Sequence, residues 1–364
     1  MVVYMNKKQN KIYIAITLFL LCCSCIFSQN IDLSGKLTFS SYYIQDETSI
    51  FLGTVKLNMT TSSSAIKSYI SATYTESTVT TEKNLEKAYI KIRLPFFSDN
   101  TMRLNIGKMP ITWGYGQIFN AGDIIFGALP TTVTYENIVS SVDSLDDMRS
   151  DTEWMINASI PVISNICNFE PIAVIPMQES KNTQDTDFES ENRFGGRLFF
   201  TPYHEQLETF EIGYLGNTNL STHKIYIGLD GSLYVDYNIS SSITLGEKDS
   251  WALSNGLQKI INFTNYQTGN EHSLILKTEE LWYPIAKNIF VFSFVSYTIS
   301  DTITAGMYYI YSYYTTNSET TNSIAASLTI TPISTLDFEL SSSLSDISEP
   351  TKNWTTAISV IYNF

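Results

Sequence analysis

The chain has 364 residues and a formal net charge of −14, with 13% aromatic and only 16% charged residues. An acidic balance of this size argues against nucleic acid as a partner, because the chain repels a phosphate backbone. A composition rich in aromatic residues, without long apolar runs beyond the N-terminal region, is typical of strands.

The N-terminal region has the order of a secretory signal peptide, in which a charged stretch precedes an apolar run and a small, polar stretch. The apolar run covers residues 12–21 and the polar stretch residues 22–29. The charged residues before the run are Lys7, Lys8 and Lys11. We expect cleavage after Ser28, which gives a signal peptide of residues 1–28 and a single mature domain of residues 29–364.

An uncleaved anchor is the alternative, but the apolar run is shorter than the roughly 18 residues that a spanning helix needs. A second alternative is lipid attachment to one of three cysteines whose flanking residues fit that signal poorly: Cys22, Cys23 or Cys25. Removal of the signal leaves Cys167 as the sole cysteine, so no intrachain disulfide is possible. The loss of three lysines also shifts the net charge to about −17.

Apolar residues recur with a period of two along the mature chain, and no helical period appears over a useful length. The alternating segments are 31–39, 51–59, 66–74, 88–94, 102–106, 154–162, 194–200, 225–235, 290–294, 303–313, 324–330, 336–344 and 354–364. Only every second residue of such a strand faces lipid, which hides a membrane barrel from hydropathy scans. We predict an all-β fold, a transmembrane antiparallel up-and-down β-barrel of about eighteen strands, or sixteen if the weak region 240–263 is not a hairpin.

The last strand shows the alternation most clearly. Trp354, Ile358, Val360 and Tyr362 share one face with the C-terminal Phe364. An apolar face of about ten residues matches the span of a tilted transmembrane strand, and such strands are stable in lipid only in a closed barrel. The pattern predicts a bacterial outer-membrane location, outer-membrane lipid as a partner, and recognition by the barrel-assembly machinery through the strand that ends at Phe364.

Successive connections along the chain alternate between short and long, as expected when the short periplasmic turns of a barrel alternate with its longer outer loops. The short connections on one side are 331–335, 300–302, 203–207 and 162–167. The longer polar connections on the other side are 315–321, 178–191, 75–84 and the long loop 110–151. A barrel this wide encloses water unless something narrows it, and 110–151 is the candidate for narrowing it.

A motif lies at the start of that loop, where a strand ends in Gly-Lys and is followed by Trp-Gly-x-Gly and Phe-Asn-x-x-Asp. Its key residues are Gly107, Lys108, Trp113, Gly114, Gly116, Asn120 and Asp123. The two glycines of Trp-Gly-x-Gly permit positive φ, Trp113 can pack against the wall, and Asp123 can accept from backbone N–H groups just beyond it. A simple rim turn without solute contact is the alternative.

This motif resembles a stretch of Gram-negative outer-membrane porins of the alginate-export and related substrate-specific kind, although Ala121 stands where those porins have proline. The resemblance covers about seventeen residues. It implies a channel for passive diffusion of small hydrophilic solutes, with this loop near the constriction.

The polar faces of the strands place basic residues on one side of the lumen and acidic residues on the other. The basic candidates are Lys36, Lys56, Lys67, Lys91, Arg93, Arg103, Arg193 and Arg197. The acidic candidates are Glu211, Asp230, Asp236, Asp337 and Glu339. Low-dielectric walls focus such a transverse field onto charged solutes; the alternative is that these groups only hydrate the lumen.

Nothing in the sequence predicts an enzyme, a metal site or a cofactor. The histidines His204, His223 and His272 share no strand face with a candidate Ser and Asp. Acidic residues of the outer loops form a solvated surface that can bind divalent cations weakly: Asp143, Asp146, Asp147, Asp185, Asp187, Glu189 and Glu191. The functional alternative to a channel is a surface-display, adhesin or structural barrel, which can be small and filled.

Overall fold

The structure is a computed structural model. It describes residues 30–44, 50–77, 81–96, 100–129, 151–163, 166–176, 191–202, 204, 206–218, 221–246, 249–264, 271–300, 302–315, 319–345 and 354–364. The signal peptide expected over residues 1–28 lies outside the described residues.

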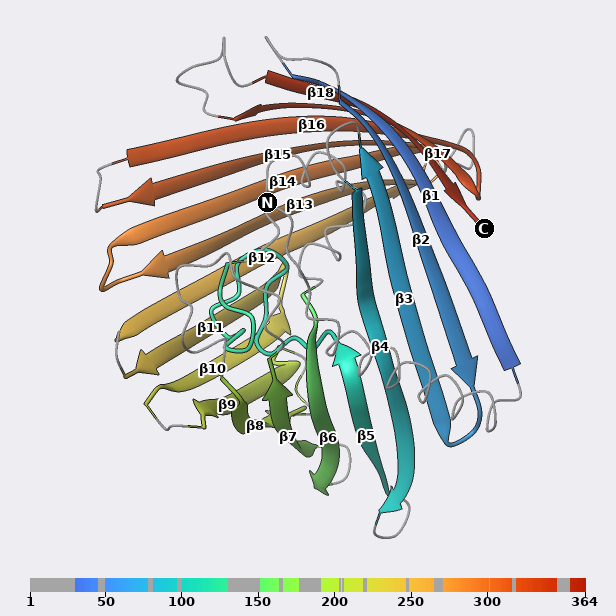
Figure 1. Ribbon diagram of the computed structural model, residues 1–364. Coiled ribbons are helices and arrows are strands. Elements are labelled where there is room, and N and C mark those ends of the chain that lie inside the picture. Colours follow the sequence, from blue (N-terminus) through green and yellow to red (C-terminus); the bar gives the residue numbers. More distant parts are fainter. Residues whose placement is uncertain are drawn as a thin grey trace.

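Within these ranges, eighteen strands form one antiparallel sheet that closes on itself, since β1 pairs with both β2 and β18 (Figure 1). The strands are β1 (Asn30–Ile44), β2 (Ile50–Ser62), β3 (Ile66–Ser77), β4 (Thr81–Phe96), β5 (Asn100–Met109), β6 (Glu153–Ile163), β7 (Cys167–Ile175), β8 (Arg193–Phe200), β9 (Thr209–Asn217), β10 (His223–Ser232), β11 (Asp236–Leu245), β12 (Ser250–Thr264), β13 (Glu271–Tyr283), β14 (Asn288–Ser300), β15 (Ile303–Tyr314), β16 (Glu319–Ile333), β17 (Leu336–Ser345) and β18 (Trp354–Asn363). This confirms the expected barrel and its eighteen strands, because the weak region 240–263 falls in the β11–β12 hairpin.

The outward face is apolar, as the alternation predicts. Leu33 on β1 and Ile358 on β18 are 75% and 60% exposed. The closing seam joins the two ends of the barrel sequence: Gly35 N–H donates to the Phe364 carbonyl at 2.8 Å, and Phe364 N–H donates to the Gly35 carbonyl at 3.0 Å. With this pairing no edge strand is left to expose unpaired backbone groups.

The connections sort onto two ends of the barrel as expected. One end, called here the turn end, carries short connections such as 63–65, 233–235 and 334–335 together with the start of β1 and the end of β18. At the other, the loop end, β5 ends and β6 begins, and β7 ends and β8 begins. The polar segment 75–84, expected as a loop, is mostly strand, because Thr75, Glu82 and their neighbours pair across β3 and β4 up to Glu76 and Thr81.

One expected face is wrong. The alternation predicted that Phe290, Phe292 and Phe294 of β14 face outward. They point into the barrel instead and are at most 4% exposed. β14 is apolar on both faces, with Ile289 and Val295 on the outer side, so alternation alone could not orient it. The inward phenylalanines pack against residues of the long loop, described below.

No helix in the ranges given above is long and apolar enough to cross a membrane.

Candidate pore constriction

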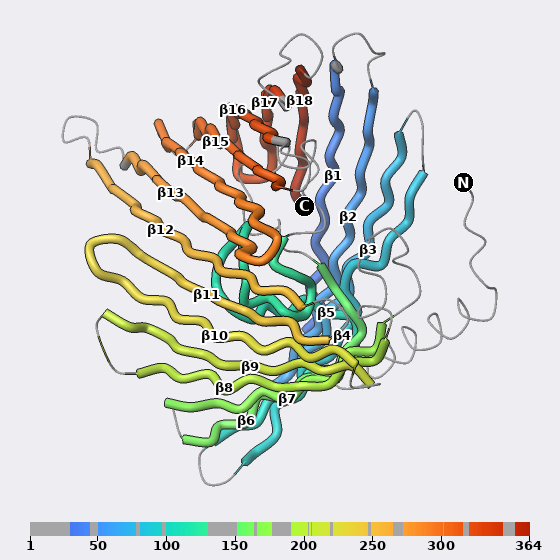
Figure 2. Tube along the Cα trace, turned by 90° about the vertical axis from the view of Figure 1, so that its left-hand side faces the viewer, coloured from blue at the N-terminus to red at the C-terminus, as the bar shows by residue number. Residues whose placement is uncertain are grey.

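Residues 110–129, called here the constriction segment, leave β5 at the loop end and fold back inside the barrel (Figures 1 and 2). The turn out of the strand depends on glycine, since Gly107, Gly114 and Gly116 have φ of 132°, 72° and 127°. These values lie in the region that side chains disfavour. A Cβ on Gly114 would also meet Asn120 Oδ1 at 2.5 Å, so the segment is folded tightly onto itself.

Two polar side chains of the motif fix the shape of the segment. Asn120 Nδ2 donates to the Trp113 carbonyl at 3.0 Å, and Asn120 Oδ1 accepts from Gly122 N–H at 3.0 Å. Asp123 Oδ1 accepts from the backbone N–H groups of residues 125 and 126 at 3.3 and 3.1 Å. Both side chains are at most 2% exposed, so the motif residues act mainly as internal braces of the segment.

Apolar side chains of the segment pack against the inner wall in two directions. Trp113 is fully buried and stacks on Tyr226 of β10, with ring centroids 5.9 Å apart. Phe119 lies against Phe290 of β14, with centroids 6.0 Å apart. The segment therefore spans the lumen between the β5–β10 side and the β12–β15 side of the wall.

A carboxylate on β13 holds the tip of the segment. Glu279 is fully buried and accepts from the backbone N–H groups of Gln117, Ile118 and Phe119 at 2.8, 2.7 and 2.9 Å. Lys277 pairs with Glu279 at 2.8 Å and also donates to the Gln117 side chain. Successive backbone N–H groups make a concave anion site, which here is filled by the protein's own carboxylate.

Hydroxyl groups of two further strands continue this attachment. Ser240 Oγ on β11 accepts from Tyr115 N–H at 3.2 Å, and Ser254 Oγ on β12 accepts from Ala121 N–H at 2.9 Å. The Tyr115 hydroxyl bonds Thr209 on β9. Burial, together with the nearby Glu211 carboxylate, raises the pKa of the Tyr115 phenol above its ordinary value, so this hydroxyl stays protonated.

Two arginines of β8 fasten the other side of the segment. Arg193 is 1% exposed and donates to the Ile125 carbonyl at 2.6 Å. Arg197 donates to the Thr112 carbonyl at 3.3 Å and pairs with Glu170 at 2.7 Å and Glu211 at 2.6 Å. Charge-assisted bonds of this kind are among the stronger hydrogen bonds, so the segment is held by the wall along its length.

The barrel register places all eight basic candidates on the inward face. Lys36 lies opposite Lys56, Lys67 opposite Lys91, and Arg93 opposite Arg103, in that order from β1 to β5. Arg193 and Arg197 point inward and contact the segment, as described above. The eight basic candidates thus fall into two groups, two arginines that hold the segment and six residues on β1 to β5. Of these six, only Lys56 forms an ion pair within the described part of the chain, with Glu86 at 2.8 Å.

The acidic candidates also face inward but are not gathered into one wall. Asp230 accepts from Thr209, Asp236 from Ser232 at 2.7 Å, and Asp337 from Thr331 at 2.7 Å. Glu339 is 4% exposed on β17, and Glu211 is held by Arg197 and by the Tyr226 hydroxyl, which donates at 2.9 Å. Of the motif residues, Lys108 lies between the inward Gly107 and Met109 and so takes the outward position.

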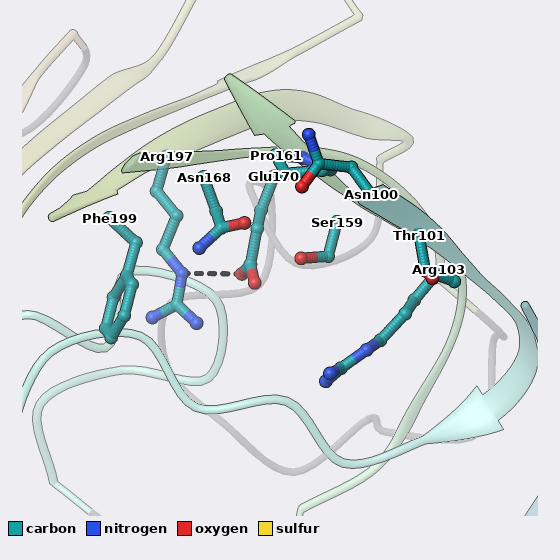
Figure 3. Close-up of a pocket in the computed structure, with 9 residues that line it drawn as sticks. All are labelled: Asn100, Thr101, Arg103, Ser159, Pro161, Asn168, Glu170, Arg197 and Phe199. Atoms are coloured by element: carbon teal, nitrogen blue, oxygen red, sulfur yellow. Dashed lines mark hydrogen bonds and ion pairs between the residues drawn. The ribbon is translucent and has the colours of Figure 1, made fainter. Parts of the chain in front are cut away.

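Two adjoining cavities lie at the turn end along β3 to β8, with volumes of about 430 and 280 Å³. Both are lined by Arg103, Ser159 and Glu170. Figure 3 shows Arg103 and Arg197 extending from separate strands into the larger cavity, where Arg197 meets Glu170. Arg197, which lines the larger cavity, also donates to the Thr112 carbonyl, so this cavity adjoins the constriction segment.

Sequence reasoning missed Lys277 and Glu279, the two residues that hold the tip of the segment. Their spacing of two on a strand was the available signal, because it places both charges on one face. Sequence reasoning placed the phenylalanines of β14 on the outward face, because that strand lacks the polar alternation that would orient it. Both sets are recognisable only once the position of the segment is known.

The expected cation-binding acids of the outer loops, Asp143, Asp146, Asp147, Asp185, Asp187 and Glu189, lie outside the described residues, whereas Glu191 is within them. Within the ranges that the structure covers, no group of three or more His, Cys, Asp or Glu side chains could hold a metal ion. Cys167 is buried and not in a disulfide.

No family model matches the chain, and no curated protein matches its sequence. Solved structures of the same fold include Pseudomonas aeruginosa OpdK with vanillate, at a TM-score of 0.59 and 10% identity, covering 93% of this chain and 99% of that one. Pseudomonas aeruginosa OccK2 (OpdF) matches at a TM-score of 0.61 and 11% identity, covering 93% of this chain and 98% of that one. A BenF-like porin from Pseudomonas fluorescens Pf-5 matches at 0.58 and 9% identity, covering 93% and 99%. The resemblance to substrate-specific porins is thereby confirmed at the level of the fold.

Proposed function

We propose that this protein is a porin-like channel of the bacterial outer membrane, through which small hydrophilic solutes diffuse passively past the constriction segment. The observation that carries the proposal is the attachment of the segment to the inner wall by Glu279, Arg193 and Arg197. A barrel of this strand number is too wide for its own side chains to fill. A segment built into the lumen narrows the opening.

The apolar outer surface supports the membrane location. Exposed side chains such as Leu33, Phe39 and Ile358 lie on a closed sheet, where lipid and not water is the favourable neighbour. The proposal includes cleavage of a signal peptide after Ser28 and recognition of the strand ending at Phe364 by the barrel-assembly machinery.

The proposed path runs along the turn-end cavities, whose walls are polar and charged. The buried acids Glu211 and Glu279 are engaged by Arg197, Lys277 and segment N–H groups. The remaining basic side chains of β3 to β5 therefore dominate the field along this path, which favours anions over cations. This preference replaces the two-walled field that the sequence suggested.

Single-channel recording of the refolded mature protein in a planar bilayer tests the channel. We expect discrete conductance steps and a reversal potential in a salt gradient that indicates anion preference. A double substitution, Lys91→Glu with Arg93→Glu, should shift the reversal potential toward cations.

Lys83→Glu is the matched control, because Lys83 is on the same strand but lies opposite Tyr74 on the outward face. A folded barrel that never conducts would contradict the channel. A reversal potential that moves equally in the control would contradict the assigned path.

A further inference from the structure

Four cations form a compact array at the turn end of the lumen. Lys67 on β3 lies directly opposite Lys91 on β4, and Arg93 on β4 lies directly opposite Arg103 on β5. All four line the cavity of about 280 Å³, together with residues 63–65 of the adjoining turn. The array thus stands at the mouth of the lumen and is separate from the residues that hold the constriction segment.

Among the residues that the structure describes, this array has one carboxylate in the wall of its cavity. Within the described part of the chain, none of the four side chains forms an ion pair. That carboxylate is Glu170, the one acidic residue among the described residues that line the cavity, and Arg197 already engages it at 2.7 Å. Like charges directly opposite one another destabilise a sheet, so two adjacent pairs without a carboxylate partner leave a concentrated positive field.

Two tyrosines contact Lys91, one of the four cations of the array. The Lys91 ammonium lies 5.4 and 5.5 Å from the ring centroids of Tyr69 and Tyr89, which are stacked 4.9 Å apart. A cation held over aromatic faces loses part of its freedom. Ser159 on β6 adds a hydroxyl group to the wall of the same cavity.

We propose that this cavity binds multivalent oxoanions, such as solutes that carry phosphate or pyrophosphate groups. Arginine forks match the oxygen pairs of such anions, and two lysines supply further charge. An anion with one negative charge neutralises only a small part of the array, whereas one with two to four charges can bridge both cross-strand pairs. The inference deepens the proposed channel function, because it assigns a binding site to the path through that lumen.

The test uses inorganic pyrophosphate added to one compartment of a planar bilayer that contains the conducting mature protein at low salt. We expect pyrophosphate on the turn-end side to reduce the chloride current, acetate at the same ionic strength to have no such effect, and added KCl to relieve the block. The double variant Lys67→Gln with Arg103→Gln should need at least about tenfold more pyrophosphate for the same block, because charge-assisted contacts are lost.

Lys36→Gln is the matched control, since Lys36 carries the same charge on the inward face but does not line the cavity. If this control needed as much additional pyrophosphate as the double variant for the same block, the block would come from a diffuse positive field, and the proposed site would be overturned. A wild-type channel that conducts and responds to pyrophosphate no more than to acetate would overturn the site and leave the channel function intact.

A folded barrel that does not conduct would refute the channel function alone. Calorimetric titration of pyrophosphate into the folded wild-type barrel in detergent then tests whether the cavity binds this anion. Binding that the double variant weakens would support it, and absence of binding heat over the same range would overturn it.

Discussion

The carboxylate of Glu279 accepts a hydrogen bond of 2.7 Å from the backbone N–H of Ile118, although 161 positions separate the two residues along the chain. Glu279 also receives the N–H groups of the residues on either side of Ile118. One side chain of β13 thus fixes the tip of the constriction segment in the lumen.

Glu279→Ala should release this tip. Buried donors left without an acceptor cost about 1–3 kcal/mol each, and Lys277 loses its ion-pair partner. We expect a higher mean single-channel conductance with larger current fluctuations, and an intermediate effect for Glu279→Gln, which keeps one acceptor oxygen.

The control for this experiment is Glu280→Ala. It removes the same charge from the next position of β13, where the side chain is exposed and accepts from Asn255 at 3.2 Å. Indistinguishable conductance of the two alanine variants would show that Glu279 does not hold the segment.

Gly114→Ala should destabilise the folded segment. Gly114 has φ of 72°, and an added Cβ would meet Asn120 Oδ1 and Gly122 Cα at 2.5 Å. The left-handed conformation alone costs a side chain about 1–2 kcal/mol, and the contacts add to this cost. Urea titration of the refolded barrel in detergent measures the free energy of unfolding.

Gly127→Ala separates the two causes, because Gly127 has φ of 102° but its nearest contact would be 3.9 Å away. We expect a smaller loss of stability there. Equal losses would mean that the backbone angle, and not the close packing onto Asn120, is the determining factor.

Ile358→Arg should weaken insertion of the last strand into lipid. The side chain is 60% exposed on the outward face of β18, and an arginine near the bilayer midplane of a barrel costs about 2–4 kcal/mol. Tyr362→Arg, on the same face one residue before the strand ends, should cost about 0–1 kcal/mol because it is close to the interface. Folding titrations in lipid vesicles give both values, and equal costs would contradict the depth assigned to Ile358.

Gly35→Ala should impair closure of the barrel. A Cβ at this position would lie 2.3 Å from Phe364 Cζ and 2.9 Å from the Lys56 carbonyl, and the backbone of Gly35 pairs with that of Phe364. We expect a lower folded yield in refolding assays by heat-modifiable gel migration.

Gly53→Ala is the control on the adjacent β2, where the nearest contacts would be 3.8 Å away. A yield as low as that of Gly35→Ala would show that loss of any strand glycine, and not the seam with Phe364, impairs folding.

Much of the wall followed from the sequence, because a strand alternates its side chains with a period of two. The inward positions of Lys67, Lys91 and Arg103 could be inferred in this way before any pairing was known. The same reasoning failed at β14, where both faces are apolar and Phe292 turned inward. Its partners are Phe294, Tyr308 and the neighbouring constriction segment, none of which local alternation can identify.

The segment itself was only partly predictable. Gly114, Gly116 and Asp123 indicated a tight turn with local backbone bonds, and the structure shows the positive φ values and the Asp123 contacts that this requires. Sequence reasoning left open whether the turn lay at the rim or in the lumen, because both arrangements satisfy the same local geometry.

The closed barrel and the sorting of its connections could be predicted from the amino-acid sequence, since both follow from short-range alternation and from the need to pair every backbone group in lipid. The choice between eighteen and sixteen strands needed the β11–β12 pairing. The roles of the inward charges depend instead on contacts between distant parts of the chain. Glu279, Arg193 and Arg197 meet the constriction segment across long chain separations, whereas Lys67 and Arg93 face partners of their own sign. Contacts of this kind depend on register and on the path of a distant loop, and neither is encoded in the local pattern that fixes a strand.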